Sequence, residues 1–224
     1  MINVIVLDIE GTTSPTSSVR EELYGYTRTR LPGWLAENEG GAADAIIAET
    51  RALAGAPGAS VAEILIDWLN TDVKAEPLKA AQGIICAEGF RNGSLYGEFF
   101  PDVPPMLRAW RESGLELYIY SSGSVRNQKD WFTFARPGDL SPLITGHFDL
   151  TTAGPKREAS SYEKIAGAIG VPAESILFLS DHPDELDAAV AAGWRAIGVA
   201  RPGEPNPPRP PHRWVGDFAD IEPN

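Results

Sequence analysis

The sequence has one cysteine and fewer basic than acidic residues. The first shortage excludes an internal disulfide, and the second argues against polyanionic partners. Cys86 has no partner in the chain, so no internal disulfide can form, as is typical of a protein kept in a reducing cytoplasm. The formal net charge of −12 argues against binding nucleic acid or an anionic membrane through bulk electrostatics. A small anionic ligand is still compatible with this charge, because a local cationic pocket or a metal ion can outweigh the global field.

Long apolar segments are also missing. The first apolar run is shorter than that of a signal peptide, has no basic segment before it, and leads directly into acidic residues. No segment approaches the ~20 consecutive apolar residues of a membrane-spanning helix. We therefore expect a cytoplasmic protein with no nucleic-acid or membrane partner.

What the sequence does contain suits one domain, or one domain that carries a smaller insert. Its 224 residues are 43% apolar, which is enough for a sizeable core. Residues 17–97 have helical periodicity throughout, most clearly in "SVAEILIDWLN", where apolar residues recur at i, i+3, i+4, i+7 and i+8. An earlier helix is predicted to end at Pro32, and a later one to begin near Pro77.

Beyond Pro101 the pattern changes to strands that alternate with helices. Counting the first apolar run, strands are predicted at residues 3–7, 115–120, 147–150, 175–180 and 195–200. This alternation indicates an α/β fold, a parallel sheet with helices on both faces. We predict a core of residues 1–16 and 98–224, interrupted by an all-helical insert of residues 17–97. The proline-rich segment 201–214 is expected to cross the surface as extended chain.

Polar residues follow four of the predicted strands at their carboxyl ends, the edge of a parallel sheet where ligands bind. In chain order these are Asp8 and Glu10, Ser121 and Ser122, Lys156, and Asp181. Each alone has an ordinary structural explanation, since serines and aspartates cap helices and a loop lysine is usually a solvated charge. Their combination favours a chemical role.

That role is phosphoryl transfer. A carboxylate such as Asp8 can attack phosphorus and form an aspartyl-phosphate, which divides hydrolysis into two easier steps. The charge on the phosphoryl oxygens needs donors, which Ser121 and helix N-terminal amides can supply, and a fixed cation, which Lys156 can supply. Mg²⁺ prefers hard oxygen ligands, and Asp8 with Asp181 provides them.

The motifs "DIEGTT", "YSSGSV", "GPKREASSY" and "FLSD…ELDAA" resemble, in this order, those of the haloacid dehalogenase superfamily of phosphohydrolases. The glutamate within "DIEGTT" is similar to that of the enolase-phosphatase branch, which serves methionine salvage. The resemblance implies a Rossmann-like core, a helical cap inserted after the first motif, one Mg²⁺ per chain, and a monomer, because closed caps often let such enzymes work alone.

The resemblance also implies a role for each residue. Asp8 would be the nucleophile and a Mg²⁺ ligand, and Asp181 would complete the metal site. Glu10 would be the general acid and base, with its backbone carbonyl on the metal. Lys156 would hold the phosphate, while Ser121 and Ser122 would bind substrate.

The reaction implied by this branch has two steps on one small phosphorylated metabolite. 2,3-Diketo-5-methylthiopentyl-1-phosphate is first enolised and then dephosphorylated to the acireductone 1,2-dihydroxy-3-keto-5-methylthiopentene. The enolisation base is left open between Glu10 and Lys156. Tyr96, where the branch has a basic residue, and Cys86, where it has an aromatic one, bear on which substrate is accepted rather than on the phosphatase chemistry.

Four alternatives compete with this interpretation. A related phosphatase could act on another small phosphorylated metabolite, such as a sugar phosphate. A dehalogenase would leave Asp181 unexplained, because its chemistry needs no Mg²⁺ site. A receiver domain is about half this length and lacks a cap, and a silent binding module has no reason to keep every catalytic position. Repeated release of phosphate would distinguish an enzyme from the last two.

Histidine and aromatic residues near these motifs are expected to be structural. His182 has no paired histidine at metal-binding spacing, so we expect it to begin a helix or to support the site. Trp34, Trp68 and Phe90 could shape a pocket for a thioether tail, but at helical spacing we expect them to be core residues.

Overall fold

The computed structural model describes residues 1–56, 58–71, 73 and 75–223. The chain divides into two compact units, which we call the core unit (Met1–Val19 with Gly97–Asn224) and the helical unit (Arg20–Tyr96).

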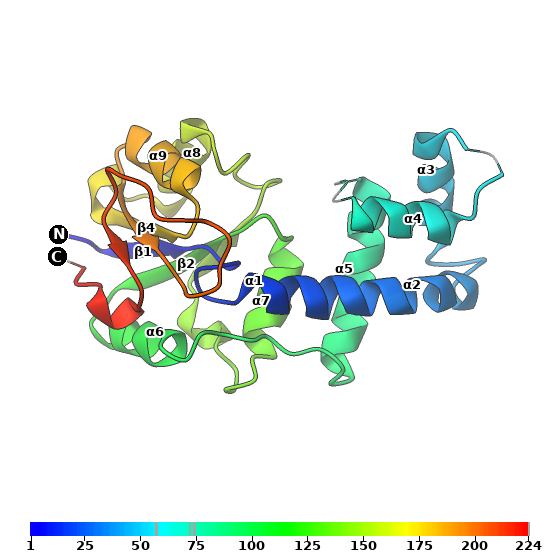
Figure 1. Cartoon of the computed structure of the whole chain (residues 1–224), viewed down its shortest axis with the longest axis horizontal. Helices are drawn as coiled ribbons and strands as arrows, with labels where there is room; N and C mark the ends of the chain where they lie inside the picture. Colours follow the sequence, from blue (N-terminus) through cyan, green and yellow to red (C-terminus); the bar gives the residue numbers. More distant parts are fainter. Residues whose placement is uncertain (57, 72, 74, 224) are drawn as a thin grey trace. The chain divides into compact units, whose positions relative to one another are not determined.

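The core unit is built on a six-stranded sheet in which every neighbouring pair is parallel (Figure 1). Its strands are β1 (Val4–Leu7), β2 (Glu116–Tyr120), β3 (Gly146–Phe148), β4 (Ile176–Ser180), β5 (Arg195–Val199) and β6 (Trp214–Val215). Their order in the sheet is β3-β2-β1-β4-β5-β6. This confirms the Rossmann-like α/β fold predicted from the sequence.

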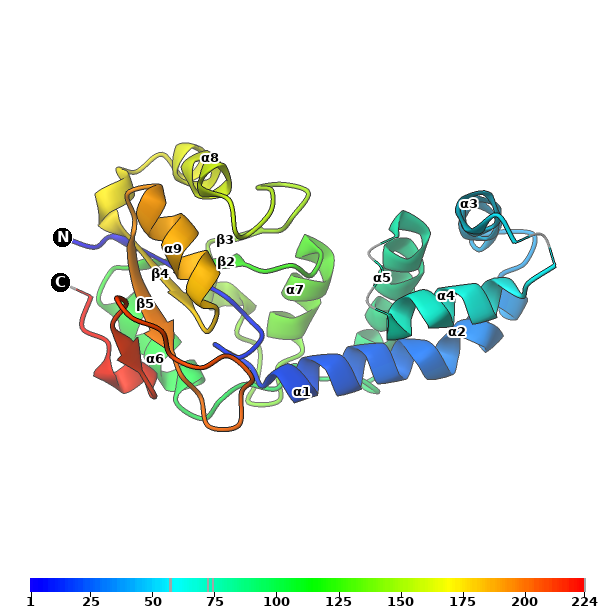
Figure 2. The ribbon, with the colours of Figure 1, turned by 45° about the horizontal axis from the view of Figure 1, so that its top comes forward.

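Helices cover both faces of this sheet, as Figures 1 and 2 show. Helices α8 (Ala159–Ile169) and α9 (Pro183–Ala191) lie over one face, and α6 (Val103–Glu112) lies over the other, while α7 (Val125–Thr133) packs beside β3. Val4 and Val6 share a buried cluster with Tyr162 of α8 and Leu186 of α9. Because successive side chains of a strand point to opposite faces, a strand covered on both sides reads as an unbroken apolar run, as residues 4–7 do.

The position of β1 at the centre of the sheet determines where the site forms. Leu7, the last residue of β1, lies in register with Ile119 of β2 and Leu179 of β4. The residues that follow these three strands therefore emerge side by side at one edge. Asp8, Ser121 and Asp181 are among them.

The C-terminal tail differs from the expectation of extended chain alone. Trp214–Val215 forms β6 and pairs with Gly198–Val199 of β5. A Cβ added at Gly198 would lie 2.3 Å from the Trp214 ring, so the absent side chain makes room for the indole. A two-residue strand after a run of prolines is too short to show a period in the sequence.

The helical unit begins with a π-helical turn, η1 (Arg20–Tyr24), which continues the short α1 (Thr16–Val19) of the core unit. It then contains α2 (Gly25–Glu37), α3 (Asp44–Ala54), α4 (Val61–Asn70) and α5 (Glu76–Arg91). The predicted helix end at Pro32 is wrong, because α2 continues through this proline to Glu37. Leu31, Trp34 and Leu35 are buried in the core of the unit, and this packing outweighs the hydrogen bond that Pro32 cannot donate.

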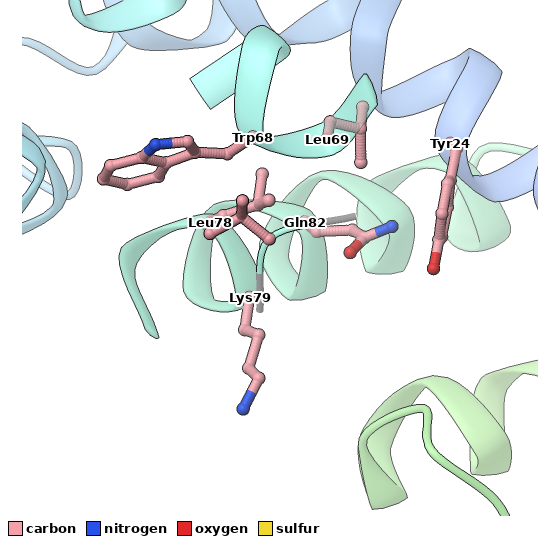
Figure 3. Close-up of a pocket in the computed structure, with 7 residues that line it drawn as sticks. Tyr24, Trp68, Leu69, Leu78, Lys79 and Gln82 are labelled. Carbon is pink, nitrogen blue, oxygen red and sulfur yellow. The ribbon is translucent and has the colours of Figure 1, made fainter. Parts of the chain in front are cut away.

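Trp34, Trp68 and Phe90 were all predicted to be core residues. Trp34 and Phe90 are buried, and Trp68 is partly buried and packs against the core of the helical unit. Trp68 also lines a small pocket (Figure 3) together with Tyr24, Leu69, Val73, Leu78, Lys79 and Gln82. Cys86 is fully buried, with its Sγ 3.5 Å from Oγ1 of Thr27.

Among the described residues, every helix is too short or too polar to span a membrane.

Candidate functional site

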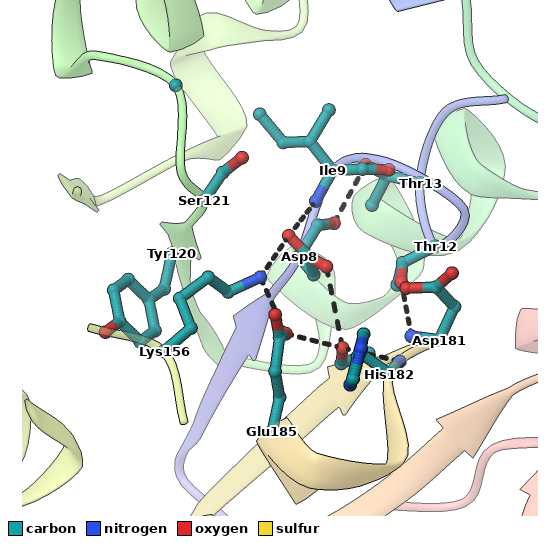
Figure 4. A network of polar contacts seen from close by, with 12 residues as sticks. Asp8, Ile9, Thr12, Thr13, Tyr120, Ser121, Lys156, Asp181, His182 and Glu185 are labelled. Atoms are coloured by element: carbon teal, nitrogen blue, oxygen red, sulfur yellow. Dashed lines mark hydrogen bonds and ion pairs between the residues drawn. The ribbon is translucent and has the colours of Figure 1, made fainter. Parts of the chain in front are cut away.

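Asp8 lies at the centre of a buried polar network at the end of β1 (Figure 4). The residue is 5% exposed, and its Oδ1 lies 2.6 Å from Nζ of Lys156 and accepts a 2.8 Å hydrogen bond from the backbone N–H of Ile9. Burial raises the pKa of Asp8 to about 6 against the opposing attraction of Lys156. The ammonium group of Lys156 thus favours the ionised carboxylate against the effect of burial.

Lys156 comes from the loop between β3 and α8 and is as buried as Asp8. Its Nζ is shared between Asp8 and Glu185, whose Oε2 lies 2.7 Å away. Burial by itself would lower the pKa of Lys156, but the two carboxylates raise it above its usual range. Tyr162 also donates a 2.7 Å hydrogen bond to the backbone carbonyl of Lys156, which fixes the loop. The site therefore contains a permanent, immobilised cation.

Glu185 is a site residue that the sequence analysis missed. It lies on the first turn of α9, and its Oε2 accepts a 2.8 Å hydrogen bond from Oγ of Ser180, which also lies 3.5 Å from Oδ2 of Asp8. An acidic residue in a first helical turn is sufficiently explained by the helix dipole, which hides its second role. The sequence feature that could have identified it is its position four residues after Asp181, which places it on the first turn of the helix at the same edge of the sheet.

Asp181 follows β4 and is held from two sides. Its backbone N–H donates to Oγ1 of Thr12 at 2.9 Å, and its Oδ2 accepts a 2.7 Å hydrogen bond from Nδ2 of Asn206. Burial, and then the negative charge of Asp8, raise the pKa of Asp181 to about 7. Neither Thr12 nor Asn206 was identified from the sequence.

The loop after β1 is a tight turn whose shape depends on Gly11. Gly11 has a φ of +70°, and a Cβ added there would lie 2.3 Å from Oδ2 of Asp181. Thr13 closes the turn, because its Oγ1 donates to the backbone carbonyl of Asp8 at 3.0 Å. Glu10 lies within this turn, half-buried, and its backbone forms a bridge with Ser14. A glycine at position 11 is thus required both by backbone conformation and by the approach to Asp181.

The segment with the two serines expected to bind substrate, Ser121 and Ser122, follows β2. Ser121 is buried and its backbone N–H donates to the carbonyl of Phe148, whereas Ser122 is exposed. Gln128 of α7 holds this segment, because its Nε2 donates to the carbonyls of Gly123 at 2.7 Å and Phe148 at 2.9 Å. Ser121 lies beside the Asp8 network in Figure 4. Asp8 follows the adjacent strand β1, and Lys156 lies in the loop that follows β3, the other neighbour of β2.

His182 begins a helix, one of the two structural roles expected for it. It is the N-cap residue of α9, where its Nδ1 accepts a 3.3 Å hydrogen bond from the backbone N–H of Asp184. Its Nε2 lies 3.0 Å from a guanidinium nitrogen of Arg157. Both ring nitrogens are thus engaged within the protein.

The residues present fit a magnesium ion. Within the part of the chain that the structure describes, no three His, Cys, Asp or Glu side chains form a metal cluster by themselves. Mg²⁺ does not need one, because it commonly takes one or two carboxylates and keeps several waters. Asp8 and Asp181 are buried carboxylates at adjacent strand ends, and the charge of Asp8 raises the pKa of Asp181. A divalent cation would relieve this repulsion and stabilise both ionised forms.

Comparisons with known proteins point in one direction. Residues 2–193 match the haloacid dehalogenase-like hydrolases. The chain is 68% identical over 225 residues to "Enolase-phosphatase E1" of Nocardia farcinica, covering 99% of this chain and 97% of that one. It is 48% identical to a protein of the same name in Pseudomonas aeruginosa, covering 98% of each chain. Among solved structures, the Unknown transcript 4 protein of Saccharomyces cerevisiae superposes with a TM-score of 0.82 at 29% identity, covering 99% of this chain and all of that one.

Proposed function

We propose a function from one premise: the chain belongs to the haloacid dehalogenase-like hydrolases and, within them, to the enolase-phosphatases. It is a phosphatase, and it enolises 2,3-diketo-5-methylthiopentyl-1-phosphate and hydrolyses the enol phosphate to the acireductone and inorganic phosphate. The single observation that supports this most is the sharing of Lys156 Nζ between Asp8 and Glu185, next to Asp181. A buried cation fixed beside a nucleophilic carboxylate is what a transferring phosphoryl group needs.

Phosphate hydrolysis proceeds through two displacements at phosphorus. A carboxylate oxygen of Asp8 attacks phosphorus as the bond to the substrate oxygen breaks, and Glu10 donates a proton to the leaving oxygen. Glu10 then removes a proton from water, whose oxygen attacks the aspartyl-phosphate, and the bond between phosphorus and Asp8 breaks. Asp8 and Glu10 are regenerated, so the enzyme turns over.

Lys156 neutralises the phosphoryl oxygens through both displacements. The ammonium group is held by Asp8 and Glu185 at 2.6 and 2.7 Å, and it needs no reorganisation when the phosphate arrives. An ammonium held by two carboxylates has no lone pair with which to accept a proton. This favours Glu10 over Lys156 as the base that removes the proton next to the substrate carbonyl.

The metal would be held by the carboxylates of Asp8 and Asp181 with the backbone carbonyl of Glu10. When bound, Mg²⁺ would offset the negative charge of the phosphate and polarise the substrate carbonyl as a Lewis acid. Among the residues of this chain, Ser121 and Ser122 bind the substrate at the adjacent strand end. The monomeric state and the cytoplasmic location stay predictions from the sequence.

To test this function, the purified protein is incubated with the diketone phosphate in two parallel reactions, one with Mg²⁺ and one with EDTA. Absorbance follows the enol while free phosphate is assayed in the same samples. We expect the enol to appear and phosphate to be released in Mg²⁺, and both to cease in EDTA. A protein that releases no phosphate from any substrate would contradict the proposal.

A second substrate separates the reaction class from the substrate identity. Release of phosphate from a generic aryl phosphate but not from the diketone phosphate would retain Asp8, Lys156 and Asp181 in their roles and identify a related phosphatase. Tyr96 would then be the residue to examine first, because it is 40% exposed, whereas Cys86 is buried in its own unit.

A further inference from the structure

The segment between β5 and β6 reaches the site from a distant part of the sequence. This segment, residues 200–213, is the proline-rich tail, and it brings Asn206 to within 2.7 Å of Oδ2 of Asp181. Asn206 lies 25 residues beyond Asp181 and between two prolines, Pro205 and Pro207. Proline fixes φ, so the flanking residues limit the backbone freedom lost when the Asn206 side chain is ordered.

Arg201 anchors the start of this tail to other residues of the core unit. Its guanidinium lies between the rings of Phe100 and Phe218, 4.5 and 4.8 Å from their centroids. It donates to the carbonyl of Thr12 at 3.2 Å and forms a 2.8 Å ion pair with Asp102. Since Thr12 Oγ1 accepts from the backbone of Asp181, Arg201 also braces the turn on which Asp181 rests.

Glu204 makes the next attachment. Its two carboxylate oxygens lie 3.2 and 3.3 Å from the backbone nitrogen of Thr16, which donates to them at the start of α1. With Arg201 before it, Glu204 fixes the path of the tail just ahead of Asn206. The contact between Asn206 and Asp181 is thus a feature of an anchored loop.

The chemistry of the amide suits a carboxylate that must bind a cation. An amide N–H donates to Oδ2 and fixes the rotamer of Asp181, yet it carries no charge that would compete with a divalent ion. A lysine or arginine at this position would neutralise the carboxylate, and an aspartate would repel it. Partners that orient metal-binding carboxylates in this way typically change metal affinity or activity 10–100-fold when removed.

We propose that Asn206 is a positioning residue, which holds the carboxylate of Asp181 in the orientation that binds the divalent cation. This inference rests on the proposed function, because it assumes that Asp181 is a metal ligand. It adds to the active site a residue from the proline-rich tail, which otherwise crosses the surface.

The test measures Mg²⁺ binding without substrate, by calorimetry, for the wild type, Asn206→Ala and Asn206→Asp. We expect Asn206→Ala to weaken Mg²⁺ binding about 10–100-fold. The affinity of Asn206→Asp should differ from that of Asn206→Ala, because the aspartate also adds a negative charge beside Asp181. Asn206→Gln, which keeps the amide on a longer side chain, should recover part of the affinity. Circular dichroism spectra in EDTA should match the wild type for all three variants, which shows that each variant folds.

Kinetics with an aryl phosphate provide a second measurement. Activity of Asn206→Ala should rise with Mg²⁺ concentration towards the wild-type kcat, with the KM for the aryl phosphate unchanged. Arg209→Gln is the matched control, since Arg209 lies on the same tail but pairs with Asp184 and Asp187 at the surface. It should bind Mg²⁺ as the wild type does.

Two results would overturn the inference. One is a wild-type Mg²⁺ affinity in Asn206→Ala; the other is an equal loss of affinity in Arg209→Gln, which would assign the effect to the tail as a whole. Both are independent of substrate identity. If the wild type binds Mg²⁺ and hydrolyses aryl phosphate but not the diketone phosphate, the proposed substrate fails while Asn206 is still tested.

Discussion

Oε2 of Glu185 lies 2.7 Å from Nζ of Lys156, the cation that we propose binds the phosphate. Asp8 holds the same ammonium group, but in the proposed mechanism Asp8 turns to phosphorus. When it does so, Glu185 is the partner that keeps Lys156 in place. The nucleophile and the cation can therefore separate without leaving an unpaired buried charge.

This arrangement predicts that Glu185→Gln weakens both the fold and the reaction. The variant keeps the shape of the side chain and an oxygen that can accept from Ser180, but it removes the charge opposite Lys156. We expect the free energy of unfolding to fall by about 1–3 kcal/mol, as for a buried hydrogen bond to a charged group. The kcat for phosphate release should fall as well. Urea unfolding and a phosphate assay measure the two effects.

Asp184→Asn is the control for this variant. Asp184 is the neighbouring acid on α9, but it is exposed and pairs with Arg209 at the surface. Because an exposed ion pair is screened by solvent, its change should alter stability little and leave kcat unchanged. Equal effects in the two variants would contradict a specific role of Glu185.

The assignment of nucleophile and general acid predicts opposite covalent outcomes at Asp8 and Glu10. Asp8→Asn should abolish phosphate release, because an amide is a poor nucleophile and forms no aspartyl-phosphate. With an aryl phosphate, whose phenolate leaving group needs neither enolisation nor a proton donor, Glu10→Gln should still be phosphorylated but should release phosphate about 10²–10⁴-fold more slowly, since water is no longer activated. Mass spectrometry of quenched protein should show a phosphoryl adduct on Glu10→Gln and none on Asp8→Asn. An adduct on Asp8→Asn would place the nucleophile elsewhere.

Much of the core unit could be predicted from the sequence because its signals are local. Apolar runs such as residues 4–7 and 176–180 indicate buried strands, and a parallel sheet necessarily gathers the residues that follow them. Asp8 and Asp181 were predicted from this rule. The start of α7 is a local signal of the same kind, because Ser124 is its N-cap and its Oγ accepts from the backbone N–H of Asn127.

The residues that were missed depend on contacts between distant segments. Asn206 and Arg201 reach the site only because the tail returns along the sheet, and nothing local in a proline-rich segment specifies that path. The wrong helix end at Pro32 has the same cause, because the packing of Leu31 and Trp34 that keeps α2 continuous is a tertiary effect. Glu185 was missed because the helix dipole already explains an acidic residue in the first turn of α9.

The turn after β1 predicts a strong effect of Gly11→Ala. The added Cβ would lie 2.3 Å from Oδ2 of Asp181, and a φ of +70° costs a residue with a side chain about 1–2 kcal/mol. Because Asp181 must move, we expect Mg²⁺ affinity and kcat to fall by more than the strain alone would cause. Calorimetric titration with Mg²⁺ and the phosphate assay would show this.

Gly114→Ala separates the two causes. Gly114 also has a positive φ, +90°, but a Cβ there would meet nothing within 4 Å. It should therefore lose a similar amount of stability from backbone strain while Mg²⁺ binding and kcat stay at the wild-type values. A Gly11→Ala variant that behaves like Gly114→Ala would show that the loop can yield without disturbing Asp181.

The stability of the core unit should depend on the charge state of His147. Burial, and then the positive charge of Lys129, lower the pKa of His147 to about 4 in the folded protein, against about 6.5 for an unperturbed histidine. Between these values the unfolded chain binds a proton that the folded protein does not. The free energy of unfolding should therefore fall as the pH drops from about 6.5 to 4, where the folded protein also becomes protonated.

Two variants test this pH dependence by urea unfolding at several pH values. His147→Gln should have a shallower slope between pH 4 and 6.5 than the wild type, because one titrating group is gone while the carboxylates are common to both proteins. Lys129→Gln should move the histidine contribution to higher pH, because it removes the second cause of the lowered pKa but leaves the burial.

Neutral His147 donates from Nδ1 to Oε1 of Gln128, at 3.2 Å, and protonation keeps this hydrogen bond. The loss in acid is then the cost of a buried charge beside Lys129, and an unchanged slope in both variants would mean that His147 is hydrated and titrates normally.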